Sequence, residues 1–292
     1  MKIDVFEPIS LCSGVESSIS MIEEARKNYP NKDIFCLGHP VHSEIISNSL
    51  KKLGIKIIEA PLSSYEDEIS KLPDGCVVVF SAHGHDKSLD DLCKTKKITI
   101  IDTTCPIVKN VDSQIKNLIL NKNKKVIYIG KENHAESYAV IKNNPLVDFW
   151  EISSSFLVDF QYIDGVVLNQ TTILKEKLEP HYSQILRENE QIIVKNTSCH
   201  YVNLRYLKLK KLDSFFYDYV IIIGSSTSSN TTELFEKAIE WHGKEKALLV
   251  SKAEDIQFMK DLEHKPESVA LFSGTSAPRE LIDSIIEALN SL

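Results

Sequence analysis

Three of the six cysteines in the chain recur at an almost constant interval. Cys12, Cys105 and Cys199 are 93 and 94 residues apart, and each ends a polar turn between an apolar run and a helical pattern. A helix N-terminus lowers the pKa of a thiol and so favours the thiolate that binds metals. The spacing therefore predicts one metal site with three cysteine ligands. Zinc with an open position and a 4Fe–4S cluster with one iron free of protein ligands both fit this prediction.

Polar loops recur with the same period as the cysteines. A first set follows strand-like apolar runs 29 or 30 residues after each cysteine, and its loops carry His42, His134 and Ser228. A second set follows further apolar runs 66 to 77 residues after each cysteine, and its loops carry His83, Thr171 and Ser276. An ordered repeat of this kind predicts three similar supersecondary units.

The apolar runs indicate the fold class. Unbroken runs such as VVVF, VIYI and YVIII are typical of strands buried on both faces of a parallel sheet. Ligands of such sheets bind beyond the carboxyl ends of the strands, where all of these polar loops are expected to lie. We predict an α/β protein of three units, at residues 1–104, 105–198 and 199–292.

The side chains in these loops favour a small polyanion. Hydroxyl, amide and imidazole groups, together with backbone N–H groups at helix starts, are phosphate ligands. His134 and Glu136 lie two residues apart in one loop and are the candidates for proton transfer. A glutamate near a cluster and a bound anion is expected to have a raised pKa, which keeps its carboxyl able to donate a proton.

Charge and composition exclude several classes of protein. The formal net charge of −7 argues against a nucleic-acid footprint, and no run of 18 apolar residues predicts a membrane span. The first residues lack the pattern of a secretory signal, so we expect a cytoplasmic protein with reduced cysteines. Cys36, Cys76 and Cys93 have no counterparts in the repeat and are interpreted as structural. The run LKLKKL at 207–212 predicts a solvated helix face with an apolar side.

Eight motifs together resemble the 4-hydroxy-3-methylbut-2-enyl diphosphate reductases (IspH/LytB), which perform the last step of the non-mevalonate isoprenoid pathway. They occur in the family's order and span about residues 8 to 280: CSGV at Cys12, VHSE at His42, FSAHG at His83, DTTCP at Cys105, HAE at His134 to Glu136, QTT at Thr171, GSSTSSN at Ser228 to Asn230 and SGTSAP at Ser276.

This resemblance implies a pseudo-threefold trefoil of α/β units around a central 4Fe–4S cluster held by Cys12, Cys105 and Cys199. It implies that Thr171 contacts the substrate hydroxyl and that Glu136 and His134 relay protons. The reaction would be a two-electron reductive dehydroxylation giving isopentenyl and dimethylallyl diphosphate, with electrons delivered singly by a ferredoxin or flavodoxin. The implied diphosphate ligands are His42, His83, Ser228, Ser229, Asn230 and Ser276.

Several positions depart from the family pattern. Pro8 to Leu11 replace a Pro-Arg-Gly-Phe run, Ser43 replaces an asparagine, and His134 to Ala139 replace His-Pro-Glu-Val-Glu-Gly. After Cys199, a threonine pair and an asparagine become Val202, Asn203 and Leu204. The chain is therefore interpreted as a divergent member. Three alternatives stay open: a reductase of another diphosphate or allylic alcohol, a non-catalytic iron–sulfur sensor, and a zinc hydrolase with Glu136 as base.

Overall fold

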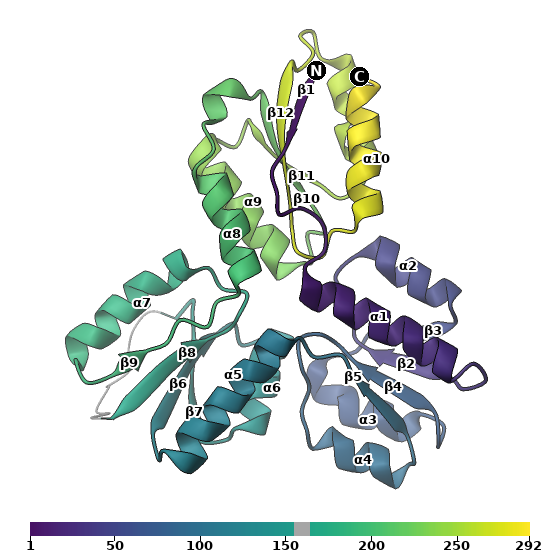
Figure 1. Ribbon diagram of the computed structural model, residues 1–292, viewed down its shortest axis with the longest axis vertical. Helices are drawn as coiled ribbons and strands as arrows, with labels where there is room; N and C mark the ends of the chain where they lie inside the picture. Colours follow the sequence, from purple (N-terminus) through teal and green to yellow (C-terminus); the bar gives the residue numbers. More distant parts are fainter. Residues whose placement is uncertain (155–163) are drawn as a thin grey trace. The chain divides into compact units, whose positions relative to one another are not determined.

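The structure of the protein, a computed structural model, describes residues 1–154 and 164–292 (Figure 1). The chain divides into two compact units. Unit 1 consists of residues 1–16, 41–49 and 200–292, and unit 2 consists of residues 17–40 and 50–199. Among the helices of the described residues, none is long and apolar enough to cross a membrane.

The described residues form three four-stranded sheets in which every strand pair is parallel. Sheet A, in unit 1, has the order β1 (Lys2–Val5), β12 (Ser268–Ser273), β10 (Tyr219–Ile223), β11 (Ala247–Val250). Sheet B, in unit 2, has the order β5 (Thr99–Asp102), β4 (Val77–Phe80), β2 (Ile34–Leu37), β3 (Ile55–Ile58). Sheet C, also in unit 2, has the order β9 (Ile193–Val194), β8 (Gly165–Asn169), β6 (Lys125–Gly130), β7 (Val147–Glu151).

The three sheets have the same plan. In each sheet, the strand that leads to a cysteine of the repeat lies at one edge, as β1, β5 or β9. The N-terminal strand β1 pairs with β12, so it completes the sheet formed by the C-terminal part of the chain. The division into residues 1–104, 105–198 and 199–292 and the pseudo-threefold trefoil stay predictions, whereas the α/β class is confirmed.

Strand burial explains why the apolar runs are unbroken. Every residue of β2, β4 and β8 is buried, because helices cover both faces of these strands. In sheet C, Ile127 and Ile129 pack with Leu178 and Ile185 of one helix on one face. Tyr128, between them, packs on the opposite face, as the two-residue period of a strand requires.

The helices complete the layers (Figure 1). Their bounds are α1 Ser13–Asn28, α2 Glu44–Lys52, α3 Tyr65–Lys71, α4 Leu89–Thr95, α5 Pro106–Lys116, α6 Ala135–Asn143, α7 Lys175–Glu188, α8 His200–Lys210, α9 Ser229–His242 and α10 Arg279–Asn290. Shorter helical segments lie at Leu62–Ser64, Asn117–Asn121, Ser214–Phe216 and Ala253–Asp261. In unit 1, α10 and the segment Ala253–Asp261 pack on the same apolar core beside sheet A.

Candidate functional site

The three repeated cysteines lie immediately before helices, as the sequence predicts. α1, α5 and α8 begin at the residues that follow Cys12, Cys105 and Cys199. The Cys12 carbonyl accepts the N–H of Glu16 at 2.9 Å, and the Cys105 carbonyl accepts that of Lys109 at 2.9 Å. These are first-turn hydrogen bonds, so both thiols stand at the positive end of a helix dipole.

A backbone hydrogen bond repeats at each of these cysteines. The cysteine N–H donates to a carbonyl in the polar loop that follows the neighbouring strand: Cys12 to Thr275 at 3.1 Å, Cys105 to Ala82 at 3.0 Å, and Cys199 to Thr171 at 2.7 Å. Those loops carry Ser276, His83 and Thr171, which the sequence predicts to contact substrate. Each candidate metal ligand is thus fixed to a loop with a candidate substrate ligand.

Exposure separates two classes of cysteine. Cys12, Cys105 and Cys199 are partly exposed, whereas Cys36, Cys76 and Cys93 are buried, and none of the six forms a disulfide. Burial raises the pKa of Cys36 to about 12 and that of Cys93 to about 11, so these two thiols stay protonated. Their position in β2 and α4 agrees with a structural role.

The donor set of the accessible cysteines fits an iron–sulfur cluster, because thiolates at helix N-termini are its usual ligands. Cys12 belongs to unit 1, and Cys105 and Cys199 belong to unit 2. Within residues 1–154 and 164–292, no group of three or more His, Cys, Asp or Glu side chains is assembled to hold a metal ion. The binding of one cluster by the three cysteines therefore stays a prediction.

Glu136 is a buried carboxyl group near these loops. Its side chain is in the first turn of α6 and is 1% exposed. Its Oε1 accepts the Thr171 N–H at 2.8 Å, and its Oε2 accepts the Thr171 hydroxyl at 2.7 Å. The Tyr128 hydroxyl donates to Oε1 at 3.1 Å. Burial raises the pKa of Glu136 to about 7, although the hydrogen bonds from Thr171 and Tyr128 oppose the rise.

Tyr128 was not predicted from the sequence, because it lies inside the apolar run of β6. Its ring is fully buried, and burial with the nearby Glu136 carboxyl raises its pKa well above the usual value. The residue therefore acts as a permanent neutral donor to the Glu136 carboxyl. The phenolic oxygen of Tyr128 in an otherwise apolar strand was the one sequence feature that could have indicated this role.

Two predicted histidines, His134 and His83, lie next to each other in unit 2. His134 is the N-cap of α6, and its Nδ1 accepts the Glu136 N–H at 3.2 Å. The rings of His83 and His134 are 5.4 Å apart and perpendicular. The Ser81 hydroxyl lies 3.3 Å from Nδ1 of His83. Four predicted residues, namely His83, His134, Glu136 and Thr171, therefore meet in unit 2.

A second group of predicted residues meets in unit 1, at the start of α9. Ser228 is the N-cap of this helix, and its hydroxyl accepts the Ser276 hydroxyl at 3.1 Å. Oδ1 of Asn230 accepts the Thr275 N–H at 2.8 Å. Ser229 is the first residue of the helix and is half-buried. His42 is also half-buried and lies in the turn before α2.

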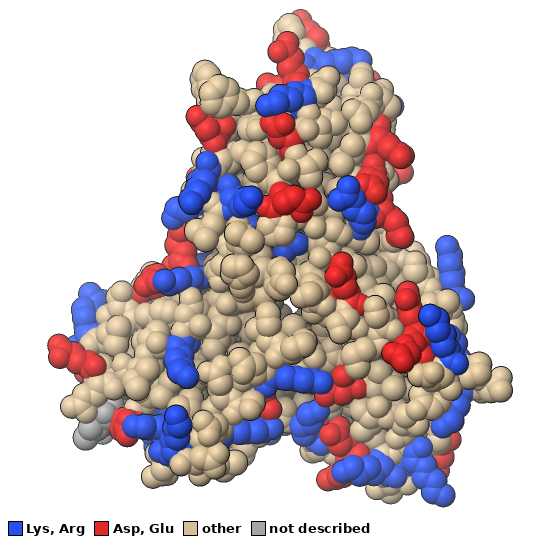
Figure 2. All heavy atoms as spheres, in the orientation of Figure 1, with Lys and Arg blue, Asp and Glu red and all other residues tan. Residues whose placement is uncertain are grey.

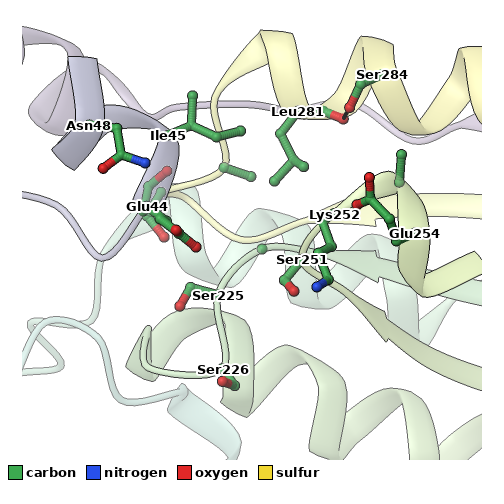
Figure 3. Close-up of a pocket in the computed structure, with 15 residues that line it drawn as sticks. Glu44, Ile45, Asn48, Ser225, Ser226, Ser251, Lys252, Glu254, Leu281 and Ser284 are labelled. Carbon is green, nitrogen blue, oxygen red and sulfur yellow. Dashed lines mark hydrogen bonds between the residues drawn. The ribbon is translucent and has the colours of Figure 1, made fainter. Parts of the chain in front are cut away.

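A cleft of about 580 Å³ lies in unit 1 beyond the carboxyl ends of β10 and β11 (Figure 3). Ser276 lines it, together with Ser43, which follows His42. Figure 3 shows Glu44 and Asn48 on one side of the cleft, facing Lys252 and neighbouring serines on the other. The sequence did not predict Lys252, because a single lysine after a strand carries no motif.

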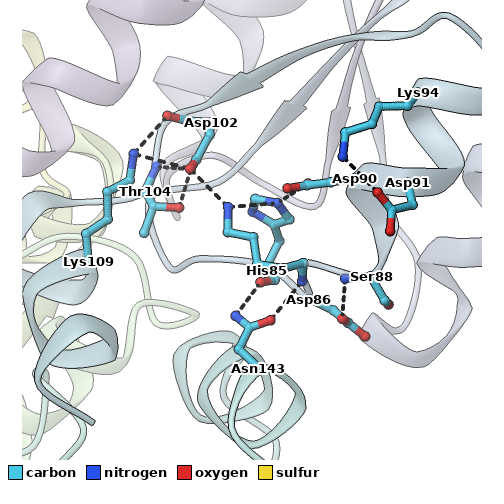
Figure 4. Close-up of polar contacts among 11 residues, drawn as sticks. His85, Asp86, Ser88, Asp90, Asp91, Lys94, Asp102, Thr104, Lys109 and Asn143 are labelled. Carbon is cyan, nitrogen blue, oxygen red and sulfur yellow. Dashed lines mark hydrogen bonds and ion pairs between the residues drawn. The ribbon is translucent and has the colours of Figure 1, made fainter. Parts of the chain in front are cut away.

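The turn before Cys105 has a different electrostatic character (Figure 4). Asp102 accepts hydrogen bonds from the Thr104 N–H at 3.0 Å and from the Thr104 hydroxyl. Lys87 and Lys109 each lie 3.2 Å from Oδ2 of Asp102. Burial alone would raise the pKa of Asp102, but Thr104 and the two lysines outweigh it and hold the pKa well below the usual value.

Comparison with known proteins gives a consistent result. The family described as "LytB protein" matches residues 3–290. A 4-hydroxy-3-methylbut-2-enyl diphosphate reductase of Kosmotoga olearia is 30% identical, over 98% of this chain and 94% of the relative. The enzyme of the same name from Dictyoglomus thermophilum is 29% identical, over 100% of this chain and 97% of the relative.

A solved structure has the same fold as the chain. It is the E-1-hydroxy-2-methyl-but-2-enyl-4-diphosphate reductase of Plasmodium falciparum, with a TM-score of 0.82 and 23% identity. The match covers 98% of this chain and 87% of the solved chain.

Proposed function

Because the chain belongs to the LytB protein family, we propose that it reduces 4-hydroxy-3-methylbut-2-enyl diphosphate to isopentenyl and dimethylallyl diphosphate. In this reaction the C–O bond of the allylic alcohol breaks and a C–H bond forms. Two electrons and two protons are consumed, and the hydroxyl group leaves as water. The chain must therefore bind a diphosphate, accept electrons singly and supply protons.

We infer that Cys12, Cys105 and Cys199 hold a 4Fe–4S cluster. Their partly exposed side chains, equivalent positions before helices and repeated backbone hydrogen bonds support this ligand set. When bound, such a cluster supplies one-electron redox chemistry and, at an iron without a protein ligand, a Lewis acid for the substrate oxygen.

The proposed diphosphate ligands are Ser228, Ser229, Asn230 and Ser276 from unit 1, with His42 and His83. Ser228 and Ser229 open α9, a helix of 14 residues whose N-terminal N–H groups and dipole favour an anion. Rotation of the Ser276 hydroxyl away from Ser228 would allow both hydroxyl groups to donate to phosphate oxygens.

The observation that carries the proposal is the raised pKa of the buried Glu136 carboxyl group. With a pKa of about 7, a substantial fraction stays protonated at neutral pH and can supply a proton. Once the proton leaves, the three hydrogen bonds from Thr171 and Tyr128 stabilise the carboxylate. The Thr171 hydroxyl donates to Glu136, and its oxygen keeps lone pairs that can accept a hydrogen bond from a substrate hydroxyl. Thr171 can therefore pass a proton from Glu136 to the substrate.

The electron donor is proposed to be a ferredoxin or flavodoxin, since a cluster accepts one electron at a time. A cytoplasmic location, where such donors occur with reduced thiols, is part of the same proposal.

The departures after Cys199 do not require a diphosphate other than the family's usual substrate. Val202 is 3% exposed and belongs to the packed interior of unit 1. Leu204 lines a surface groove with Phe6. Val202 therefore has a packing role and Leu204 belongs to a surface groove, so neither apolar residue requires a change of substrate.

Iron and sulfide analysis after anaerobic purification tests the ligand set. Wild-type protein should carry about four irons per chain and form both products with a chemical reductant. Cys105→Ser should lose most of the iron, whereas Cys76→Ser, a buried control, should retain it. Equal iron in both variants, or no iron after reconstitution of the wild type, would overturn the proposal.

A further inference from the structure

An open groove with apolar walls lies in unit 1 beside α8. It has a volume of about 480 Å³, and its lining includes Phe6, Leu204, Leu207, Lys208, Lys211 and Phe216. Leu207 is 48% exposed and Phe216 is 66% exposed. The neighbouring Phe215 is 85% exposed. Such apolar exposure, concentrated along one groove, marks a surface that a partner covers.

The run at 207–212 has the solvated face and the apolar side that the sequence predicts, but one leucine departs from this pattern. An apolar side that faces the protein accounts for Leu209, which is fully buried. It does not account for Leu207, which turns toward solvent between the helix and the segment Ser214–Phe216. The exposed leucine therefore needs an explanation other than core packing.

The charge beside the groove is positive. Lys208 and Lys211 are exposed and three residues apart at the end of α8, and neither forms an ion pair within the described residues. By contrast, Lys109 pairs with Asp102. Asp213 is the one acidic residue among the lining residues of the groove, in a chain with a net charge of −7. Figure 2 shows basic side chains over α8.

The groove adjoins two segments that lead to proposed cluster ligands. α8 begins directly after Cys199, so Lys208 lies about 14 Å along the helix from that cysteine at 1.5 Å per residue. Phe6 lies six residues before Cys12 and stacks on Phe272 of β12, with ring centroids 4.7 Å apart. A redox partner in the groove would contact segments that continue directly along the chain into both proposed ligands.

We propose that this groove docks the acidic protein that delivers electrons to the enzyme, an inference that rests on the proposed function. The lysines attract the negative surface of the donor, and the apolar walls bind it for the time of transfer. In each encounter the reduced donor loses one electron and the enzyme gains it. Two encounters supply the two electrons of one turnover.

The size and charge of the groove favour a redox protein over a membrane. Electron-transfer complexes are small and transient, burying less than about 1,200 Å² in total. Segments that bind anionic lipid usually present roughly four to eight lysines or arginines. Here two unpaired lysines flank a concave apolar surface, which suits a small complementary protein.

A charge-reversal variant tests the proposal on the cluster-loaded enzyme. In Lys208→Glu/Lys211→Glu, kcat/KM for reduced flavodoxin should fall at least about tenfold at low ionic strength. The difference from wild type should narrow as salt screens the charges. Turnover driven by dithionite with methyl viologen should stay unchanged, because a small reductant needs no docking surface. Lys260→Glu, an exposed lysine elsewhere in unit 1, is the control and should match wild type in both assays.

Binding of oxidised flavodoxin gives a readout that needs neither substrate nor turnover. A larger dissociation constant for oxidised flavodoxin in the double variant, but not in Lys260→Glu, supports docking at the groove even if the proposed substrate is wrong. Equal flavodoxin-driven rates and equal affinities in the wild type and the double variant would overturn the proposal. So would loss of binding to phosphatidylserine vesicles with unchanged flavodoxin kinetics, which would assign the groove to a membrane surface.

Discussion

Glu136 and Asp102 are two carboxyl groups of unit 2 whose surroundings drive their pKa values in opposite directions. Glu136 is buried and Asp102 is partly buried, and burial by itself raises the pKa of each. Glu136 is surrounded by neutral donors, so its pKa stays at about 7. Asp102 accepts two hydrogen bonds from Thr104 and also lies 3.2 Å from each of two lysines, and its pKa falls below the usual value. The number of donors and the presence of cations together decide whether a carboxyl group stores a proton or holds a fixed charge.

The largest expected effect comes from removing the proton of Glu136. Glu136→Gln keeps the size of the side chain and a carbonyl oxygen that can accept from Thr171, but it cannot donate an acidic proton. We expect kcat to fall by about 10²- to 10⁴-fold with unchanged iron content. Steady-state turnover with dithionite and methyl viologen measures this loss. Asp102→Asn is the matched control. If it lowered kcat as much as Glu136→Gln does, the contrast drawn between the two carboxyl groups would be wrong.

The pH dependence of stability should distinguish Glu136 from an ordinary surface acid. Because folding raises its pKa, its contribution to stability is fully present below the unfolded pKa of about 4.5 and is lost as pH rises through about 7. Relative to wild type, Glu136→Gln should therefore become more stable between pH 5 and pH 8.5, by on the order of 3 kcal/mol. Urea unfolding at the two pH values measures the change. A constant difference between the two proteins would show that the carboxyl group is ionised throughout.

Asp102 should give the opposite pH dependence. Its lowered pKa contributes stability above the unfolded pKa of about 3.8, and this stability is lost as pH falls through the lower folded pKa. Asp102→Asn should destabilise the protein at pH 7 by about 1–2 kcal/mol, since Thr104 and two lysines lose a charged partner. Unfolding at pH 7 in low and high salt checks this, because salt should shrink the effect. Insensitivity to salt would mean that the lysines contribute little.

The smallest predicted effect concerns Tyr128. Its hydroxyl donates to the Glu136 carboxyl and lowers that pKa, so Tyr128→Phe should raise the Glu136 pKa by less than about one unit. The alkaline limb of the kcat profile should move to higher pH, with only a few-fold change in kcat at pH 7. A shift to lower pH would contradict the donor role of Tyr128.

The sequence was sufficient to predict the fold class and the position of the three repeated cysteines before helices. Apolar runs and the cysteine period carry that information, because they follow from burial on both faces and from a repeated strand–turn–helix unit. The pairing of β1 with β12 was not predictable, since parallel partners distant in the chain leave no local pattern.

Within the candidate site, the motif residues were predictable, but the residues and contacts that hold them in place were not. The Glu136–Thr171 contact joins loops 35 residues apart, and Tyr128 looks like any other residue of an apolar strand. Gly224 shows a similar limit: it has a φ of +148°, and a Cβ there would lie 2.7 Å from Thr231 Oγ1. Only the packed structure reveals why glycine is needed at that turn.

The most direct test of the account is the protonation state of Glu136 itself. Infrared difference spectra of wild type minus Glu136→Gln, recorded as the pH is raised from 5 to 9, report the C=O stretch of a protonated carboxyl group. A band that disappears with a midpoint near pH 7 is the predicted result, since it places an available proton beside Thr171. Absence of the band across this range would mean that Glu136 is ionised at neutral pH, and the proposed proton donor would be contradicted.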